Sequence, residues 1–217
     1  MQLSIREPGN ALTHFVGTGL AIFAGIPLLI KASACGFKDL LAMLVFVCSM
    51  ILLYTASTLY HSVTFAPGII KFFRKIDHMM IFILIAGSYT PVCLLILEPN
   101  SGYPLLAVIW GLAFVGIIVK ALWITCPKWF SSAIYIAMGW LCVFVFGPII
   151  NNIPRQAFYW LLAGGIIYTI GGVIYALKLP LFDAKHEFFG SHAIFHLFVM
   201  GGSACHFVFM YRYALSI

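Results

Sequence analysis

Charged residues are scarce in this sequence. Only 8% of its 217 residues are Asp, Glu, Lys or Arg, whereas 63% are hydrophobic. A soluble domain of this length needs a polar surface, so the composition excludes a soluble protein and predicts a membrane protein. The formal net charge of +6 is the excess that loops carry beside an anionic membrane surface. Nothing in the sequence predicts a nucleic-acid partner.

Closely spaced cysteine pairs are also lacking. Four of the six cysteines fall singly inside apolar segments, and two fall near opposite membrane faces: Cys48, Cys93, Cys142 and Cys205, then Cys35 and Cys126. Without a close pair, neither a thiolate metal site nor a disulfide framework is expected. We therefore expect the cysteines to serve as small apolar residues.

Long apolar runs dominate what is present. A helix needs roughly 20 apolar residues to cross a hydrocarbon core of ~30 Å, and seven stretches reach that length, near 11–30, 40–61, 77–97, 103–125, 131–150, 156–177 and 191–213. Barrel strands alternate in polarity and do not give such continuous runs. No connection between the stretches is long enough for a soluble domain. The sequence therefore predicts one domain over residues 1–217, an all-α seven-transmembrane helix bundle.

The distribution of Lys and Arg predicts the orientation in the membrane, because basic loops are retained in the cytoplasm. The N-terminus and the loops after the second, fourth and sixth segments carry seven basic residues, and the opposite side carries four: Arg6, Lys71, Arg74, Lys75, Lys128, Lys178 and Lys185 against Lys31, Lys38, Arg155 and Arg212. We expect a cytoplasmic N-terminus and a C-terminus outside.

Two further segments have structural interpretations. Residues 69–76 mix apolar and basic side chains, which is typical of a short helix at the lipid interface, although a simple basic loop fits as well. Small residues in the last two apolar segments would let neighbouring backbones approach closely: Gly164, Gly165, Gly171, Gly172, Gly201, Gly202, Ser203 and Ala204.

Five ionisable residues gather at the predicted inner face. His61 ends the second segment, Asp77 and His78 begin the third, and His192 and His196 begin the seventh. Ionisable groups are costly inside a membrane and usually mark function. Asp77 taken alone can equally be a carboxylate that caps a helix N-terminus. The convergence of all five favours a functional site.

The spacing of these residues favours a metal. Residues four apart on a helix lie on the same face and rise ~6 Å, so His192 and His196 can bind one ion. Ser57 stands in the same relation to His61 and can orient what that residue holds. Three neutral imidazoles with a fourth position for water form a catalytic zinc site, with Asp77 at the same depth. Zinc is preferred to copper because no Cys or Met cluster accompanies the histidines.

The remaining histidines carry less weight. His14 begins the first segment at the same face and can act as a supporting residue, a fourth ligand or an interfacial hydrogen-bonding group. His206 stands ~21 Å further along its helix than His192, so it cannot bind the same ion and is expected to line a cavity or contact a neighbouring helix. His186 is expected in a solvated loop, and His78 is expected to point to a different side of its helix from Asp77.

The motifs resemble a known family. They are Ser57-Thr58-Leu59-Tyr60-His61, Asp77, Ser191-His192-Ala193-Ile194-Phe195-His196, the early Glu7, Asn10 and His14, and the stretch Gly201-Gly202-Ser203-Ala204-Cys205-His206-Phe207. Together they are similar to the bacterial haemolysin III family, within the progestin and adipoQ receptor superfamily, over nearly the whole chain. In adiponectin receptors that share the pattern, the matching positions imply that His61, His192 and His196 bind zinc. The resemblance implies that Asp77 contacts the metal through water and that Ser57 belongs to the same motif.

Two features differ from the receptor branch and fit the bacterial one. Asp77 is followed by His78 rather than by an aromatic residue, and no long N-terminal domain precedes the first apolar segment. Short outer loops offer little surface for a protein ligand, so no protein hormone is expected. Seven apolar helices without an amphipathic pore-forming segment also disfavour direct lysis. The resemblance implies a multi-pass protein of a bacterial inner membrane.

Three functions follow as hypotheses. The first is a zinc-dependent hydrolase of a lipid amide or ester, in which Asp77 accepts or relays the proton; the analogy is to alkaline ceramidases, which share an inner-face zinc motif. The second is a membrane lipid sensor or homeostasis protein with structural zinc and a lipid or fatty acid in an intramembrane cavity. The third, which the sequence favours least, is an ion or proton transporter that uses the histidines.

Overall fold

The computed structural model describes residues 5–177 and 189–216, and within them the protein is entirely helical apart from its connections. In this described part of the chain, seven helices are long and apolar enough to cross a membrane, which confirms the predicted fold class. The elements are α1 (Pro8–Cys35), α2 (Phe37–Ser62), α3 (Pro67–Pro91) with the π-helix η1 (Val92–Ile96), α4 (Pro99–Leu122), α5 (Lys128–Gly139), the 3₁₀ helix η2 (Trp140–Val145), α6 (Phe146–Asn152), α7 (Arg155–Leu177), and α8 (Ser191–Phe209) with the π-helix η3 (Met210–Ala214).

Helix boundaries follow from local chemistry. Pro8, Pro67 and Pro99 stand in the first turn of α1, α3 and α4, where no intrahelical partner is lost and the fixed φ of proline favours a helix. Gly36 separates α1 from α2 with a φ of 145°, which a residue with a side chain rarely adopts. This single residue reverses the chain between two long helices.

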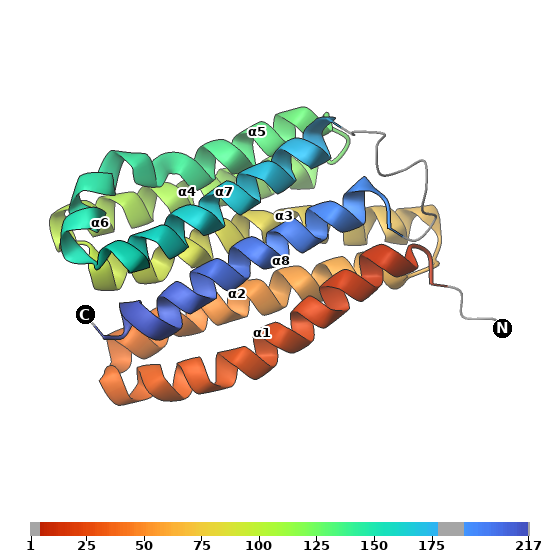
Figure 1. Ribbon diagram of the computed structural model, residues 1–217. Coiled ribbons are helices and arrows are strands. Elements are labelled where there is room, and N and C mark those ends of the chain that lie inside the picture. Colours follow the sequence, from red (N-terminus) through yellow and green to blue (C-terminus); the bar gives the residue numbers. More distant parts are fainter. Residues whose placement is uncertain (1–4, 178–188, 217) are drawn as a thin grey trace.

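Six of the seven spans form a closed ring. Contacts join α1 to α2, α2 to α3, α3 to α5, α5 to α7, α7 to α8, and α8 back to α1, while α4 packs on α3. The long helices lie side by side along the length of the bundle (Figure 1). In the most apolar part of α2 and of α3, 56% of the residues are buried, against 22% in α4. Helices α2 and α3 therefore build the centre of the bundle.

The fifth span is interrupted by a 3₁₀ stretch, and a tyrosine of α3 forms hydrogen bonds with backbone groups at the interruption. It runs from Lys128 to Asn152 as α5, η2 and α6, and a 3₁₀ stretch leaves backbone groups without their usual helical partners. Tyr89 of α3 donates its hydroxyl to the Gly139 carbonyl at 2.7 Å and accepts the Cys142 N–H at 2.9 Å. Inside a membrane such groups need a protein partner, so Tyr89 makes the interruption tolerable.

Glycines allow α7 and α8 to approach closely, as the sequence predicts for small residues. A Cβ atom at Gly164 would lie 2.4 Å from His206, one at Gly171 2.6 Å from Phe198, and one at Gly202 2.7 Å from Tyr168. Gly165, in contrast, has nothing within 4 Å of such an atom. The packing interpretation is thus confirmed for part of the glycine set.

The third span differs from the prediction. Helix α3 begins at Pro67 rather than near Asp77, so residues 69–76 form its first turns instead of a separate interfacial helix or a loop. No helix-breaking residue occurs between Gly68 and Asp77, and the helix continues through the basic segment. Asp77 consequently lies in the helix interior, and Ala66 is the N-cap. The capping interpretation of Asp77 is wrong.

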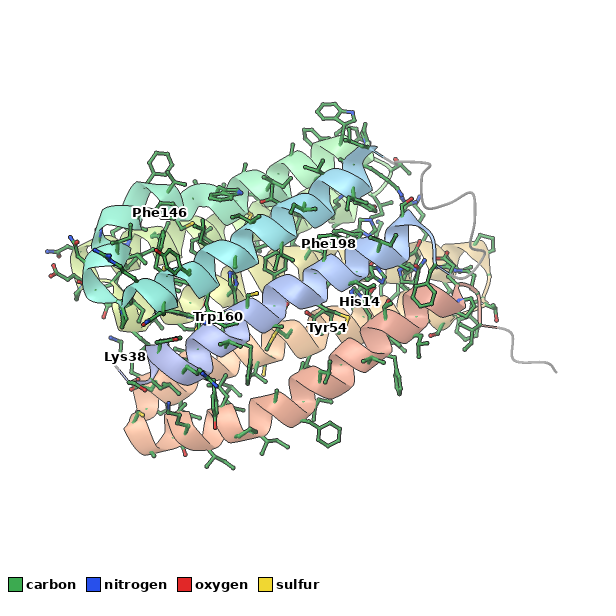
Figure 2. The ribbon with its side chains drawn as sticks, in the orientation of Figure 1. His14, Lys38, Tyr54, Phe146, Trp160 and Phe198 are labelled. Atoms are coloured by element: carbon green, nitrogen blue, oxygen red, sulfur yellow. The ribbon has the colours of Figure 1, made fainter. Side chains whose placement is uncertain are left out.

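The bundle exposes apolar side chains along its outer faces, as lipid contact requires. Helix α1 begins at one end and η3 finishes at the opposite end, and Figure 2 shows His14 towards the first end and Lys38 and Phe146 towards the other. Opposite ends agree with an odd number of crossings. Which end faces the cytoplasm stays a prediction, and two of its supporting residues, Lys178 and Lys185, lie outside the described residues, as does His186.

Candidate metal centre

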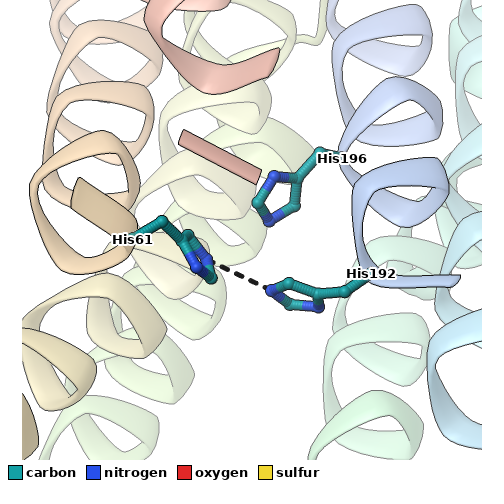
Figure 3. Close-up of side chains that lie close together, drawn as sticks. All are labelled: His61, His192 and His196. Carbon is teal, nitrogen blue, oxygen red and sulfur yellow. Dashed lines mark hydrogen bonds between the residues drawn. The ribbon is translucent and has the colours of Figure 1, made fainter. Parts of the chain in front are cut away.

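Three histidines from two helices meet at one end of the bundle. His61 lies in the last turn of α2, and His192 and His196 occupy successive turns at the start of α8. Each offers a ring nitrogen, and these atoms all lie within 4.8 Å of one another. The Nε2 atoms of His61 and His192 are 3.2 Å apart (Figure 3). The fold therefore brings together the residues predicted as metal ligands and forms a group that can hold a metal ion.

The other nitrogens of two of these rings are held by the protein. His61 Nδ1 lies 2.6 Å from Glu7 Oε2, and a carboxylate only accepts at such a contact, so Nδ1 carries the proton. His196 Nδ1 lies 3.3 Å from the Asn10 carbonyl and 3.0 Å from the Thr13 hydroxyl. Thr13 already donates to that carbonyl, so His196 Nδ1 also carries the proton. Both rings therefore turn an Nε2 lone pair towards the cluster.

This donor set fits zinc. Only 1% of His61 and 2% of His196 is exposed, and converging lone pairs in a buried place need a cation or a proton donor between them. Three imidazole nitrogens, two with their opposite N–H fixed by a hydrogen bond, match the ligands and supporting contacts of catalytic zinc sites. The His192 and His196 rings also lie edge to face, with their centroids 4.5 Å apart.

Glu7 is a site residue that sequence reasoning did not single out from chemistry. It precedes α1, its N–H donates to the His61 carbonyl at 3.0 Å, and its carboxylate accepts from Asn10. The hydrogen bond from His61, with smaller contributions from Asn10 and Arg6, lowers the pKa of Glu7 to about 2 despite partial burial. Arg6 in turn donates to the Tyr60 carbonyl at 2.7 Å. The start of the chain is thereby fixed against the end of α2.

Asp77 and His78 face the same interior. Both are buried, and Asp77 Oδ2 lies 3.4 Å from His78 Nδ1, which also donates to the Arg74 carbonyl at 2.9 Å. Asp77 stands outside the group whose ligand atoms converge. The sequence predicts that His78 points to a different side of α3 from Asp77, and both side chains nevertheless line the same cavity.

Ser57 and His14 complete the polar end. Ser57 is fully buried, and its hydroxyl has no hydrogen-bond partner among the described residues. His14 stacks on His196 with ring centroids 3.7 Å apart and an interplanar angle of 11°, and neither of its ring nitrogens has a partner among those residues. Both side chains line the cavity beside the histidines. Each therefore offers an unused polar group to whatever occupies that space.

A cavity of about 120 Å³ extends from the histidines into the bundle. All six spans of the ring contribute to its wall, and α4 contributes nothing. Its lining is polar near His192 and His196 and mostly apolar beyond them, with Leu53, Ile81, Leu84, Ile85, Ile136, Trp140, Phe195 and Val199. A second cavity of about 80 Å³ shares lining residues with the first and continues among apolar side chains of η1, α6 and α7.

His206 lies where the two cavities adjoin. It lines both, and its Nε2 lies 3.3 Å from the Leu161 carbonyl. Gly164 leaves room for the ring. The sequence predicts a residue that lines a cavity or contacts a neighbouring helix, and both predictions are confirmed.

Known proteins resemble this chain over nearly its full length. The model of a family described as Haemolysin-III related matches residues 3–207. Hemolysin-3 of Bacillus cereus is 42% identical over 212 residues, covering 97% of this chain and 92% of that protein. The Hemolysin-3 homolog of Bacillus subtilis (strain 168) is 36% identical over 213 residues, with 98% and 96% covered. Progestin and adipoQ receptor-like protein 1 of Caenorhabditis elegans is 27% identical over 228 residues, covering 93% of this chain and 50% of that protein.

Proposed function

The chain belongs to the haemolysin III family, a family of multi-pass membrane proteins, and on that premise we propose that it is a zinc-dependent hydrolase of a membrane lipid amide or ester. One observation carries the proposal. Three histidines converge, and two of them, His192 and His196, line the polar end of a cavity that continues among mostly apolar side chains of the membrane-spanning helices. Such a shape suits a substrate with a polar carbonyl group and an acyl chain.

The histidines would hold the metal through the Nε2 atoms of His61 and His196 and one nitrogen of His192. A bound zinc ion supplies Lewis-acid chemistry, since it polarises a carbonyl and acidifies water. The protein contributes orientation: Glu7 fixes the ring of His61, and Asn10 and Thr13 fix the ring of His196. Because hydrogen bonds fix the orientation of these two rings, their donor nitrogens stay in place to bind the metal.

Asp77 is the residue that we assign to proton transfer. Its carboxylate lines the cavity beside the histidines and stands outside the converging ligand atoms. One of its oxygens can therefore take a proton from a water molecule in the cavity and return it to the leaving group. The unused hydroxyl of Ser57 can donate to the substrate or to water. The apolar wall beyond excludes bulk water from the acyl chain.

The test is turnover of defined lipids by detergent-purified, zinc-loaded protein. A panel of ceramides, acylglycerols and phospholipids is incubated with the protein, and released fatty acid is measured by mass spectrometry. The proposal predicts release from at least one amide or ester, which stops after chelation and returns with zinc. Release that continues at the same rate in chelated protein contradicts it, as does a zinc-loaded protein that hydrolyses none of the panel.

A lipid sensor with structural zinc is the second candidate, and His14 is the observation that favours it. This residue is buried against His196 with both ring nitrogens unused among the described residues, so it offers a fourth imidazole that can close the site. Cobalt substitution separates the candidates, because its absorption spectrum reports the ligand set. A spectrum unchanged by His14→Ala favours the open, hydrolytic site, and a changed spectrum favours the closed one.

A further inference from the structure

A second polar cluster lies between α4 and α5, apart from the histidines. Lys120 occupies the last turn of α4, Cys126 lies in the connection, and Ser131 lies in the first turn of α5. Lys120 Nζ is 3.0 Å from Cys126 Sγ and 2.5 Å from Ser131 Oγ, and the Ser131 hydroxyl lies 3.2 Å from the same sulfur. Each of the three side chains thus contacts the other two.

The cluster is buried. Only 3% of Lys120 and 7% of Cys126 is exposed, and Ser131 is buried as well. A buried ammonium needs a partner of opposite charge, yet none of the carboxylates among the described residues forms an ion pair with Lys120. The group closest to its charge that can become an anion is the Cys126 thiol. This pairing favours a thiolate beside an ammonium.

The surroundings support that protonation state. Burial by itself raises the pKa of the Cys126 thiol, but the hydrogen bonds from Ser131 and Lys120 and the positive charge of Lys120 outweigh it and lower the pKa below its usual value. Arg74 on α3 adds a smaller positive contribution. The phenols of Tyr135 on α5 and Tyr175 on α7 also interact electrostatically with Cys126. A thiolate is the form that reacts with peroxides.

We propose that Cys126 and Lys120 form a modification site for hydroperoxides, in which oxidation joins the two side chains through a reversible sulfur–nitrogen bond. In the first step the Cys126 thiolate attacks one oxygen of hydrogen peroxide, the O–O bond breaks, and a sulfenic acid forms. The released hydroxide takes a proton from the Lys120 ammonium and leaves as water. The sulfur is oxidised and the peroxide is reduced.

In the second step the neutral Lys120 amine attacks the sulfenic acid sulfur. The S–O bond breaks, an S–N bond forms, and the departing hydroxyl leaves as water with a proton from the nitrogen. Sulfenic acids are known to condense in this way with nitrogen nucleophiles, and the amine is already beside the sulfur. Two equivalents of a thiol reverse the bond and restore both side chains, with release of a disulfide of that thiol.

The consequence is a covalent link between the end of α4 and the α4–α5 connection. Lys75 of α3 also donates to the Ala121 carbonyl next to Lys120, so the link would fasten the place where α3, α4 and α5 meet. This site shares no residue with the three histidines. Its test therefore stands apart from the proposed hydrolase activity.

The experiment exposes detergent-purified full-length protein to hydrogen peroxide and analyses tryptic peptides by mass spectrometry. The proposal predicts that the peptide spanning Lys120 and Cys126 loses two hydrogens, that trypsin no longer cleaves after Lys120, and that dithiothreitol restores both. Lys120→Arg keeps the charge without a reactive amine, so oxidation should stop at a sulfenic acid that dimedone traps. Cys205→Ser is the matched control and should behave as the wild type.

Two results overturn the proposal. If trypsin still cleaves the oxidised wild-type protein after Lys120, no S–N bond has formed. If the loss of two hydrogens persists in Lys120→Arg, it has another origin. A measurement on the wild type alone guards against a variant that fails to fold. Alkylation of Cys126 against pH should reach half its maximal rate below ~8.5, the usual thiol pKa, and a midpoint at or above that value contradicts the paired thiolate.

Discussion

The two ends of the internal cavity differ sharply in chemistry. At one end His14, Ser57, Asp77, His192 and His196 turn polar groups into it. At the other, the continuing cavity is lined by Val92, Cys142, Phe146, Ile149, Phe158, Leu161 and Leu162, with His206 where the two spaces adjoin. A membrane bundle that needed only stability would have no reason to concentrate ionisable groups at one end. The asymmetry matches a ligand with a polar head and an apolar tail.

The two ends of the cavity also differ in whether their polar side chains have hydrogen-bond partners. Near the histidines, buried nitrogens and hydroxyls remain without partners among the described residues, including Ser57 Oγ and both nitrogens of His14. Further along the cavity more of the polar groups are used by the protein itself: Tyr168 bonds to Ser203, and His206 Nε2 bonds to the Leu161 carbonyl, although His206 Nδ1 has no partner among the described residues. Unused polar groups mark the place where a ligand is expected.

The largest effect is expected at Asp77. Asp77→Asn keeps the shape of the side chain but removes the group that accepts a proton, so lipid turnover should fall by roughly 10²- to 10⁴-fold. Zinc content should stay the same, because Asp77 lies outside the converging ligand atoms. The measurement is fatty acid release together with metal analysis of the same sample. Loss of the metal together with the activity would contradict this prediction and show that Asp77 is needed to hold the metal.

A smaller effect is expected at Glu7. Glu7→Gln weakens the contact that orients His61, and loss of such a supporting contact costs about 10- to 100-fold in metal affinity. Competition with a coloured zinc chelator measures the change. Glu98→Gln is the matched control, since Glu98 is the exposed N-cap residue of α4 at the opposite end. Equal affinities in the two variants would remove Glu7 from the site.

The smallest effect is expected at Gly164, where the change concerns packing only. A Cβ atom in Gly164→Ala would lie 2.4 Å from the His206 ring, and such overpacking costs typically 1–3 kcal/mol. Thermal unfolding in detergent should show a lower Tm with unchanged zinc content. Gly165→Ala provides the control, because nothing lies within 4 Å of its added atom. If the control unfolds at the same lowered temperature, the contact with His206 is not the cause.

Much of the fold was predictable because its signal is local. Apolar length alone identifies seven spans, and the four-residue spacing of His192 and His196 places both on one face of a helix. The meeting of His61 with them was predictable from topology, since the second span ends where the seventh begins. The sequence could not show that one nitrogen of each ring lies within 4.8 Å of the others.

The failures have physical causes. Residues 69–76 have the mixed composition of an interfacial segment, yet they continue α3 because no breaker follows Pro67 and Gly68. The contact of Glu7 with His61 joins positions that no periodicity relates, and a short segment before α1 makes it. Cys126 resembles the other single cysteines until the fold places Lys120 beside it. Each case depends on tertiary contacts that composition does not encode.

Metal content is the most direct test of the three-histidine zinc site. Mass spectrometry measures zinc in detergent-purified wild type, His61→Ala, His192→Ala and His206→Ala under the same conditions. The first two variants each lack a predicted ligand, and the third lacks a histidine outside the group of three. A three-histidine site requires about one zinc per chain in the wild type and in His206→Ala, and none in His61→Ala and His192→Ala. Equal zinc in all four proteins, or none in carefully handled wild type, would contradict it.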